Sequence, residues 1–261
     1  MKKFYVVGNK VSKSMSPTIF NYWFKKHNIK AKYGFLELNK KNFDQEIKSI
    51  LKEKNLSGLN ITIPFKKSII KHLDGLEKHS KKINAVNCVS IRSKTTGFNT
   101  DWIGYYETLP KEAKLKKNNI IVIGYGGAAL SIHYLLYIKG YKNIFIFNRT
   151  KRKLNFQKGL KYTKSLNKMS KYLKSADMII NTTPLNPIST KNIKHVKKNT
   201  ILSDIVYSPK ETGFLSSFPN NKKIFGISML IMQASHCFNI WFGFKPTIDP
   251  RLLKILEKKI Q

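Results

Sequence analysis

Residues 120–129 read Ile-Ile-Val-Ile-Gly-Tyr-Gly-Gly-Ala-Ala, and they decide which kind of fold this chain adopts. The apolar run 120–123 predicts a strand buried on both faces. The glycines after it fit the pattern G-x-G-x-x-A, in which glycine allows a tight turn and lets the backbone approach a pyrophosphate. A helix follows, with apolar residues at Leu130, Tyr134, Leu135 and Ile138. A tight structural turn is the alternative. Strand, loop and helix in this order instead predict a Rossmann-type unit that binds a dinucleotide through Gly124, Tyr125, Gly126, Gly127 and Ala128.

The residue after the next strand indicates which dinucleotide binds. Enzymes that use NAD usually place Asp or Glu there, because a carboxylate accepts a hydrogen bond from the ribose 2′-hydroxyl. The predicted strand 144–147 is followed instead by Asn148, and two of the chain's four arginines come soon after it. Arginine pairs with a phosphate dianion, and lysine adds charge. We therefore expect NADP as the cofactor, bound near Asn148, Arg149, Thr150, Lys151, Arg152 and Lys153.

Strand and helix patterns alternate through the first hundred residues, which predicts an α/β layer with a largely parallel sheet. We expect strands at 4–7, 35–38, 59–63 and 85–91, and a helix over 43–51. Another helix is predicted to begin with Ser16 as its N-cap and Pro17 at the first helical position. A domain boundary falls near Asp101. Beyond it we expect a helix at 102–109, strands at 120–123, 144–147, 178–180 and 201–206, and helices over 229–241 and from 249 onward.

Length and composition are typical of a globular protein with two ordinary domains. The chain has 261 residues, of which 41% are hydrophobic, and no apolar run approaches the ~18 residues of a membrane span. The basic start leads into an apolar run too short for a secretory signal, so we expect a cytoplasmic protein with no membrane partner. Cys88 and Cys237 form neither a disulfide framework nor a zinc pattern. We expect two buried free thiols and no metal site.

The formal net charge of +35 is the feature most open to misinterpretation. All but four of the 49 basic residues are lysine, and they are spread along the whole chain. Lys, Asn and Ile are the residues that A/T-rich codons encode, so a biased genome explains the charge. Nucleic-acid modules usually concentrate their phosphate-binding and base-reading residues on one element. We expect salt-sensitive, non-specific binding at most, and no specific nucleic-acid partner.

A second informative stretch is Gly58-Leu59-Asn60-Ile61-Thr62-Ile63-Pro64-Phe65-Lys66. Its alternation of apolar and polar residues predicts a strand with one polar face, which Pro64 ends just before Lys66. Residues 97–101 form a short polar loop that places Asp101 at the start of a helix. Taken singly, these residues would be a surface lysine and an N-cap aspartate. At the ends of neighbouring elements they make a proton-transfer pair, in which the carboxylate orients the ammonium.

These segments together resemble the shikimate dehydrogenase family over residues 4–243. Residues 8–17 resemble its N-terminal serine signature, and Asn84-Ala85-Val86-Asn87 resembles its Gly-Ala-Val-Asn segment. The glycine loop, Asn148-Arg149-Thr150 and Met229-Leu230-x-x-Gln233 follow in the family's order. Several motifs in one order are far more specific than any one of them.

The resemblance implies two α/β domains with the active site in the cleft between them. Residues 1–101 would bind substrate, residues 102–228 would form the Rossmann-type NADP domain, and helices of 229–261 would pack back on the first domain. The implied activity is the reversible, NADP-dependent reduction of 3-dehydroshikimate to shikimate, in chorismate and aromatic amino-acid biosynthesis. Hydride would move between nicotinamide C4 and substrate C3. Lys66 would exchange a proton with the substrate oxygen, and Asp101 would hold Lys66 and a substrate hydroxyl in place.

The resemblance also assigns binding residues. Ser14 and Ser16 would bind the substrate carboxylate at a helix N-terminus, with Tyr207 nearby, and the ring hydroxyls would contact Asn60, Thr62, Asn87 and Gln233. Ile205 and Gly226 join the cofactor site. The sequence departs from the family pattern at Asn84, at Asn186-Pro187 and at Ser228, and the last two lie where the nicotinamide and its ribose are expected.

Several alternatives remain open at this point. A quinate/shikimate dehydrogenase that uses NAD is disfavoured by the missing acid at Asn148. A non-catalytic, degenerate homologue is disfavoured by the intact Lys66 and Asp101, because drift would readily erode one of only six aspartates. The sequence is compatible with a monomer or a homodimer.

Overall fold

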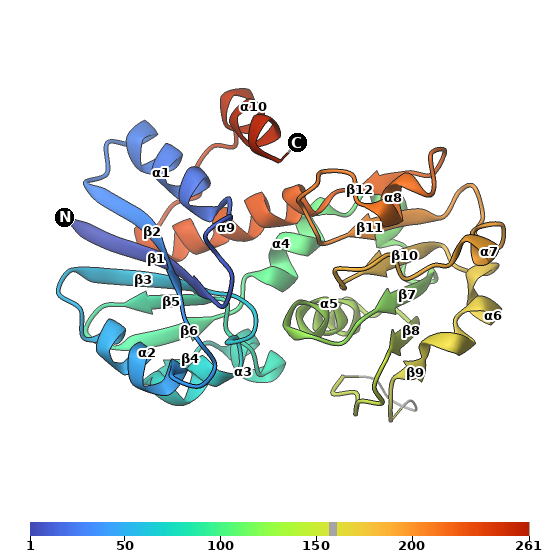
Figure 1. The fold of residues 1–261 in the computed structure, drawn as a ribbon, viewed down its shortest axis with the longest axis horizontal. Helices are drawn as coiled ribbons and strands as arrows, with labels where there is room; N and C mark the ends of the chain where they lie inside the picture. Colours follow the sequence, from blue (N-terminus) through green and yellow to red (C-terminus); the bar gives the residue numbers. More distant parts are fainter. Residues whose placement is uncertain (157–160, 261) are drawn as a thin grey trace. The chain divides into compact units, whose positions relative to one another are not determined.

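The computed structural model describes residues 1–156 and 161–260, which form two compact units (Figure 1). Unit 1 contains residues 1–104 and 231–259, and unit 2 contains residues 105–230 and Ile260. The predicted domain ranges also include residues 157–160 and 261, which lie outside the described residues. Each unit combines a sheet with helices, so the predicted α/β class is confirmed.

The sheet of unit 1 is mixed rather than largely parallel. Its described strands lie in the order β2-β1-β3-β5-β6-β4. They are β1 (Lys2–Gly8), β2 (Ala31–Glu37), β3 (Leu56–Ile61), β4 (Gly75–Leu76), β5 (Cys88–Ile91) and β6 (Thr95–Phe98). β1 runs parallel to β2 and β3, but β5 runs antiparallel to β3 and β6. The tight turn at 92–94 explains the pairing of β5 with β6, since so short a connection can only join antiparallel strands. The prediction missed this hairpin.

Helices cover both faces of this sheet. They are α1 (Ser16–Lys26), α2 (Phe43–Leu51), α3 (Lys78–Ile83), α10 (Pro250–Lys259) and the part of α9 (Gly226–Phe242) that belongs to unit 1. Phe4 of β1 packs against Phe24 of α1 and Trp241 of α9. Val7 lies in a separate buried cluster with Leu59 of β3 and Ile47 of α2. Because successive strand residues point to opposite faces, β1 contributes side chains to the hydrophobic core on each face of the sheet.

Several local predictions in unit 1 are wrong. The strand predicted at 35–38 is β2, which begins at Ala31, and the strand predicted at 85–91 is β5, which begins only at Cys88. Strand β3 ends at Ile61, so Ile63 lies outside the strand and is 69% exposed instead of joining the core. Helix α1 has no side-chain N-cap from Ser16; Ser16 is its first residue, and Met15 precedes it. The Ser16 N–H donates instead to Ser14 Oγ over 3.2 Å, so the serine two residues earlier satisfies that helical donor.

Unit 2 has a fully parallel, doubly wound sheet among its described residues. Its order is β12-β11-β10-β7-β8-β9, formed by β7 (Asn119–Ile123), β8 (Asn143–Asn148), β9 (Lys164–Ser165), β10 (Met178–Asn181), β11 (Ile201–Asp204) and β12 (Lys223–Ile224). From β7 the chain first winds outward through β8 and β9, then returns to the other side of β7 and continues through β10. Ligands of such sheets bind where the order reverses, beyond the carboxyl ends of β7 and β10.

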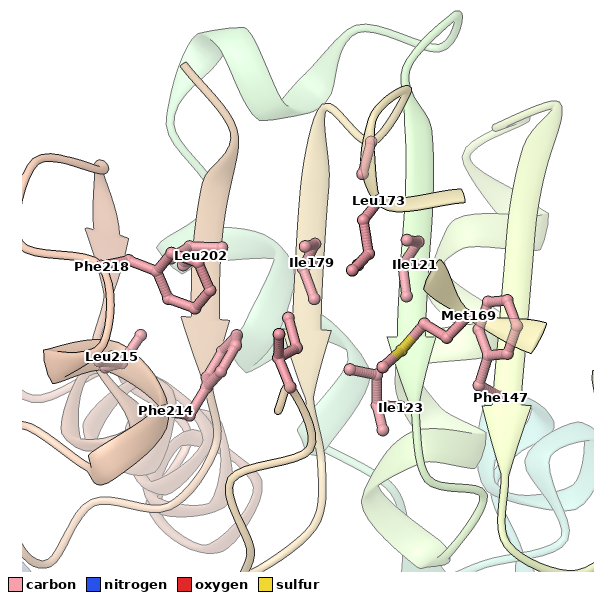
Figure 2. Close-up of a cluster of buried hydrophobic side chains, with 12 residues drawn as sticks. Ile121, Ile123, Phe147, Met169, Leu173, Ile179, Leu202, Phe214, Leu215 and Phe218 are labelled. Atoms are coloured by element: carbon pink, nitrogen blue, oxygen red, sulfur yellow. The ribbon is translucent and has the colours of Figure 1, made fainter. Parts of the chain in front are cut away.

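The helices of unit 2 include α4 (Asp101–Thr108), which begins in unit 1, and α5 (Gly127–Ile138), with shorter helices α6 (Ser170–Leu173), α7 (Thr190–Ile193) and α8 (Gly213–Ser216). Short 3₁₀ helices occur in the chain at Ser68–His72, Lys111–Lys114 and Leu166–Lys168. Figure 2 shows the core on one face of the sheet, where Ile121, Ile179 and Leu202 meet side chains of α6 and α8. Among the described helices, none has the length and apolarity that crossing a membrane requires.

Candidate active site

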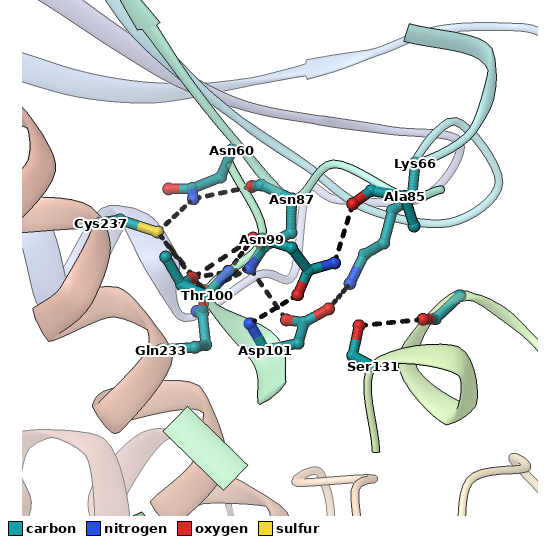
Figure 3. Close-up of polar contacts among 11 residues, drawn as sticks. Asn60, Lys66, Ala85, Asn87, Asn99, Thr100, Asp101, Ser131, Gln233 and Cys237 are labelled. Carbon is teal, nitrogen blue, oxygen red and sulfur yellow. Dashed lines mark hydrogen bonds and ion pairs between the residues drawn. The ribbon is translucent and has the colours of Figure 1, made fainter. Parts of the chain in front are cut away.

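Lys66 and Asp101 form a close ion pair in unit 1, with 2.6 Å between Lys66 Nζ and Asp101 Oδ2 (Figure 3). Their side chains are only 12% and 6% exposed. Lys66 lies in the turns after β3, and Asp101 is the first residue of α4, as the sequence predicted. An ion pair so sheltered from water is screened little by salt, and it holds a proton donor at a defined position.

Asp101 is fixed from two further directions. Its second oxygen, Oδ1, accepts a hydrogen bond of 2.9 Å from Asn87 Nδ2. Its backbone N–H donates to Asn99 Oδ1 over 3.1 Å, and Asn99 Nδ2 in turn donates to the carbonyl of Ala85. The carboxylate therefore has little freedom to rotate, and its Oδ2 stays directed at Lys66.

Asn87 is the centre of a buried polar cluster. Besides Asp101, its Nδ2 approaches Thr100 Oγ1 at 2.9 Å and Gln233 Oε1 at 3.1 Å, and its Oδ1 accepts the Thr100 N–H at 2.7 Å. Gln233 comes from α9, far along the chain, and is buried rather than a surface helix residue. Of the predicted substrate residues, the structure thus brings together Asn87 and Gln233 beside the Lys66–Asp101 pair.

Asn60 extends the cluster toward β2 and α9. Its Nδ2 donates to the Asn87 carbonyl and to Cys237 Sγ, both at 3.1 Å, and its Oδ1 accepts from the hydroxyl of Tyr33 at 2.7 Å. Burial raises the pKa of Tyr33 well above its ordinary value, so this phenol stays protonated and donates. The polar side of β3 is therefore buried beneath α9 and does not face solvent.

The other predicted substrate residues have different positions. Ser16 is buried at the start of α1, and Ser14 is half-buried just before it. Thr62 is half-buried in the turn after β3. Tyr207 belongs to unit 2, where it follows β11. Among the described residues, no group of His, Cys, Asp or Glu side chains is arranged to hold a metal ion.

In unit 2 the glycine loop occupies the reversal point of the sheet. Gly124 directly follows β7 and has φ +98°, and a Cβ there would collide with Thr182 Oγ1, at the end of β10. Thr182 Oγ1 donates to the Ile123 carbonyl over 2.6 Å, which joins the two strand ends. A Cβ at Gly126, which precedes α5, would meet no atom within 4 Å. This open backbone at a helix N-terminus fits the pyrophosphate of a dinucleotide.

The basic segment lies beyond the end of β8. Residues 149–153 are all exposed, and Asn148 Nδ2 donates to the Thr150 carbonyl at 2.7 Å, which curls the segment back on itself. Arg152 exchanges hydrogen bonds with Thr163 through its backbone N–H and carbonyl. The cationic residues therefore lie on an ordered backbone after β8, the strand that pairs with β7 before the glycine loop. Such a group of cations could pair with a phosphate.

Gly226 shows why glycine begins α9. A Cβ at this position would collide with the carbonyl oxygens of Val206 and Ile205, so the helix start and the segment after β11 can approach only without a side chain. Ile205 is half-buried there, and its N–H donates to the Asn181 carbonyl at 3.1 Å.

The departures from the family pattern have structural explanations in two places. Asn84 ends α3 with φ 57°, a left-handed conformation that asparagine adopts more easily than any other non-glycine residue. Asn186 Nδ2 donates to the Gly213 carbonyl and to Ser217 Oγ, both at 3.1 Å, so it ties its loop to α8. Ser228 lies in the first turn of α9, and nothing in the structure explains its replacement of glycine.

Sequence reasoning missed Tyr33, Asn99, Thr100 and Cys237, which all hydrogen-bond to predicted site residues. For Asn99 and Thr100 a signal existed, because both lie in the loop 97–101 that delivers Asp101. Tyr33 and Cys237 gave none: Tyr33 precedes the strand predicted at 35–38, and Cys237 belongs to the apolar pattern of the helix predicted at 229–241. The prediction of free, buried thiols for Cys88 and Cys237 is confirmed.

Comparison with known proteins gives one consistent result. Residues 6–89 match the family model of the shikimate dehydrogenase substrate binding domain, and residues 107–209 match that of shikimate / quinate 5-dehydrogenase. A shikimate dehydrogenase (NADP(+)) of Clostridium botulinum is 34% identical over 249 residues, 90% of this chain and 95% of the relative. One from Staphylococcus epidermidis is 32% identical over 98% of both chains. A crystal structure of a shikimate dehydrogenase in complex with NADP+ is 30% identical, with a TM-score of 0.85 over 100% of this chain and 96% of its own.

Proposed function

The chain belongs to the shikimate dehydrogenase family, and we propose that it catalyses the reversible, NADP-dependent reduction of 3-dehydroshikimate to shikimate. The observation that carries this proposal is the sheltered Lys66–Asp101 pair, 2.6 Å apart and joined through Asn87 to Gln233. A ketone reduction needs one proton at the carbonyl oxygen, and this pair supplies a positioned donor.

We assign unit 1 to substrate binding and unit 2 to the cofactor. When bound, NADPH supplies the hydride that the carbonyl carbon receives. Lys66 Nζ transfers its proton to the ketone oxygen as negative charge develops there, and takes a proton back from water afterwards. In the oxidation direction, neutral Lys66 removes the proton from the hydroxyl. Asp101 Oδ2 orients Nζ throughout and stabilises its charged form.

The amide cluster supplies orientation. Shikimate carries hydroxyl groups and a carboxylate, and amides come from Asn60 in β3, Asn87 just before β5 and Gln233 in α9. We assign these amides and Thr62 to the ring hydroxyls, and Ser14, Ser16 and Tyr207 to the carboxylate. An analogue without the hydroxyls would lose the hydrogen bonds that orient the ring, so we expect it to be a poorer substrate.

In the cofactor unit, Gly124, Gly126 and the start of α5 would hold the pyrophosphate, with Tyr125, Gly127 and Ala128 completing the loop. The 2′-phosphate would meet the segment from Asn148 to Lys153, with Arg149 as its main partner. Ile205 and Gly226 would lie by the nicotinamide. The absence of a carboxylate at Asn148 favours NADP over NAD, because that position carries the residue that recognises a free 2′-hydroxyl in NAD enzymes. We place the enzyme in the cytoplasm.

The test is a spectrophotometric assay of the purified chain, with shikimate and quinate each offered NADP and NAD. We expect the largest kcat/KM for shikimate with NADP. A preference for quinate with NAD would establish the rival dehydrogenase instead. A folded protein that reduces neither cofactor would point to a non-catalytic homologue.

A further inference from the structure

Tyr125, inside the glycine loop, contacts the segment that follows the cationic residues. Its hydroxyl accepts the backbone N–H of Asn155 at 3.2 Å and lies 3.2 Å from His133 Nδ1 on α5. Asn155 is two residues beyond Lys153. One phenol therefore joins three elements: the loop that begins α5, the helix itself, and the end of the basic segment.

His133 supports the tyrosine from within the protein. Its side chain is fully buried, and in the part of the chain that the structure describes its Nε2 has no hydrogen-bond partner. Burial lowers the pKa of His133 to about 4, so the imidazole is neutral at physiological pH. A buried N–H without an acceptor costs more than a buried lone pair without a donor. We therefore place the proton on Nδ1, where it donates to the Tyr125 oxygen.

The basic segment is thus held at both ends. At its start, Asn148 Nδ2 binds the Thr150 carbonyl at 2.7 Å. At its end, Asn155 binds Tyr125, and the Phe156 ring packs on α5 with its centroid 5.4 Å from that of His133 and 5.3 Å from that of Tyr134. The cation side chains themselves are exposed, although Lys151 Nζ lies 4.4 Å from the centroid of the Tyr162 ring. The backbone anchoring at both ends acts together with the Arg152–Thr163 hydrogen bonds to limit where the charges can go.

We propose that Tyr125 is a positioning residue for NADP, whose hydroxyl fixes the cationic segment 149–153 relative to the glycine loop. The inference rests on the proposed function, in which these two elements bind the 2′-phosphate and the pyrophosphate of one cofactor. The distance between those two groups is set by the cofactor. A segment already held at the matching position loses less conformational entropy on binding. NAD has no 2′-phosphate, so its affinity does not depend on the segment.

The experiment measures dissociation constants of NADPH and NADH from their fluorescence, alongside KM and kcat, for Tyr125→Phe. We expect the dissociation constant and KM for the NADP couple to rise roughly two- to tenfold, as for one lost hydrogen bond. The dissociation constant and KM for NAD should rise by a clearly smaller factor, because NAD has no 2′-phosphate. The matched control is Tyr141→Phe, which removes a hydroxyl that donates to the Ala113 carbonyl at 3.0 Å in the same unit. Tyr141→Phe should leave the ratio of the dissociation constants for NADPH and NADH unchanged.

Two variants of His133 test the positioning role of Tyr125 without changing the tyrosine itself. His133→Leu removes the partner of Tyr125 and should weaken NADP in the same way, whereas His133→Asn, whose amide reaches the place of Nδ1, should restore binding. Equal losses for both cofactors in Tyr125→Phe, or no loss in either Tyr125→Phe or His133→Leu, would overturn the proposal. Arg149→Ala distinguishes failure of the proposed 2′-phosphate site from failure of the positioning role of Tyr125. If it leaves NADPH affinity unchanged, the assignment of the segment to the 2′-phosphate fails; if it weakens NADPH while Tyr125→Phe does not, only the positioning role fails.

Discussion

Asn87 Nδ2 donates a 2.9 Å hydrogen bond to Asp101 Oδ1, the carboxylate oxygen that Lys66 does not use. Each oxygen of Asp101 thus has its own partner, one an amide of the proposed substrate site and the other the proposed proton donor. The amide cluster and the ion pair are one connected structure. A change to either member of the pair should therefore disturb both the proton donor and the amides of the proposed substrate site.

Lys66→Ala should lower kcat by roughly 10²- to 10⁴-fold, the usual contribution of a positioned acid or base, with a smaller change in KM. Asp101→Asn should lower kcat by a similar factor. The double variant should lose much less than the product of the two, because the residues act as a unit. Lys67→Ala, at an exposed neighbour, is the control in steady-state assays. Near-normal kcat in Lys66→Ala would refute the assignment.

Arg149→Ala combined with Lys153→Ala should raise KM for NADP about 10-fold or more, as expected for lost charge-assisted hydrogen bonds. KM for NAD should hardly change. Lys198→Ala, an exposed lysine elsewhere in unit 2, controls for loss of overall charge. If KM rises equally for NAD and NADP, these side chains do not recognise the 2′-phosphate.

Gly124→Ala should disrupt the cofactor loop. The residue has φ +98°, and an added Cβ would collide with Thr182 Oγ1, so the loop must shift. We expect KM to rise at least several-fold for both NADP and NAD, together with a lower melting temperature. Gly213→Ala is the matched control, because a Cβ there meets no atom within 4 Å and its φ lies outside the left-handed region. Wild-type cofactor binding in Gly124→Ala would show that the loop tolerates a side chain.

His133 predicts a specific pH dependence of stability. Its pKa of about 4 in the folded protein lies below the ordinary value of 6.5, so the unfolded chain takes up the proton first as pH falls. The free energy of unfolding should therefore fall as the pH drops from about 6.5 to about 4, by a total of about 3 kcal/mol, and should not change through His133 above about pH 6.5. The difference in free energy of unfolding between wild type and His133→Leu, measured by urea unfolding across this range, should show that loss. A flat His133 difference would contradict the prediction.

The scattered lysines predict a salt response. Any binding to DNA should disappear between low and moderate salt, because it would rest on counterion release alone. Dehydrogenase activity at saturating cofactor should survive, since the Lys66–Asp101 pair is sheltered, while NADP affinity should weaken modestly. A gel-shift series run beside the enzyme assay measures both. Sequence-selective nucleic-acid binding at physiological salt would reveal a second function.

The features that could be predicted from sequence were local ones. The buried strand, the glycine loop and the helix of residues 120–138 are consecutive, so their periodicity and glycine spacing are readable directly. Asp101 at the start of α4 and the strands of unit 2 were found for the same reason. The two-residue strands β9 and β12 are too short to leave a pattern.

The missed features depend on residues distant in sequence. Asn60 reads as the polar side of a strand, and only the packing of α9 makes it buried, since Cys237 and Gln233 lie about 170 positions further along the chain. Tyr33 precedes the strand predicted at 35–38 but lies within β2, and only the order β2-β1-β3 brings its hydroxyl to Asn60. Ile63 shows the opposite error. Its alternation with Thr62 continues the pattern of β3, but the chain has already turned after Ile61.

Unit 1 is assembled from two stretches, 1–104 and 231–259, and this has a consequence for how the protein is made. On the ribosome, β1 emerges before unit 2, yet Trp241, whose ring centroid lies 4.6 Å from that of Phe4, is synthesised after it. The sheet of unit 1 therefore has an aromatic face uncovered while nearly all of unit 2 becomes available to fold. Unit 1 is begun before unit 2 and completed after it, and the nascent chain is most exposed to aggregation during that interval.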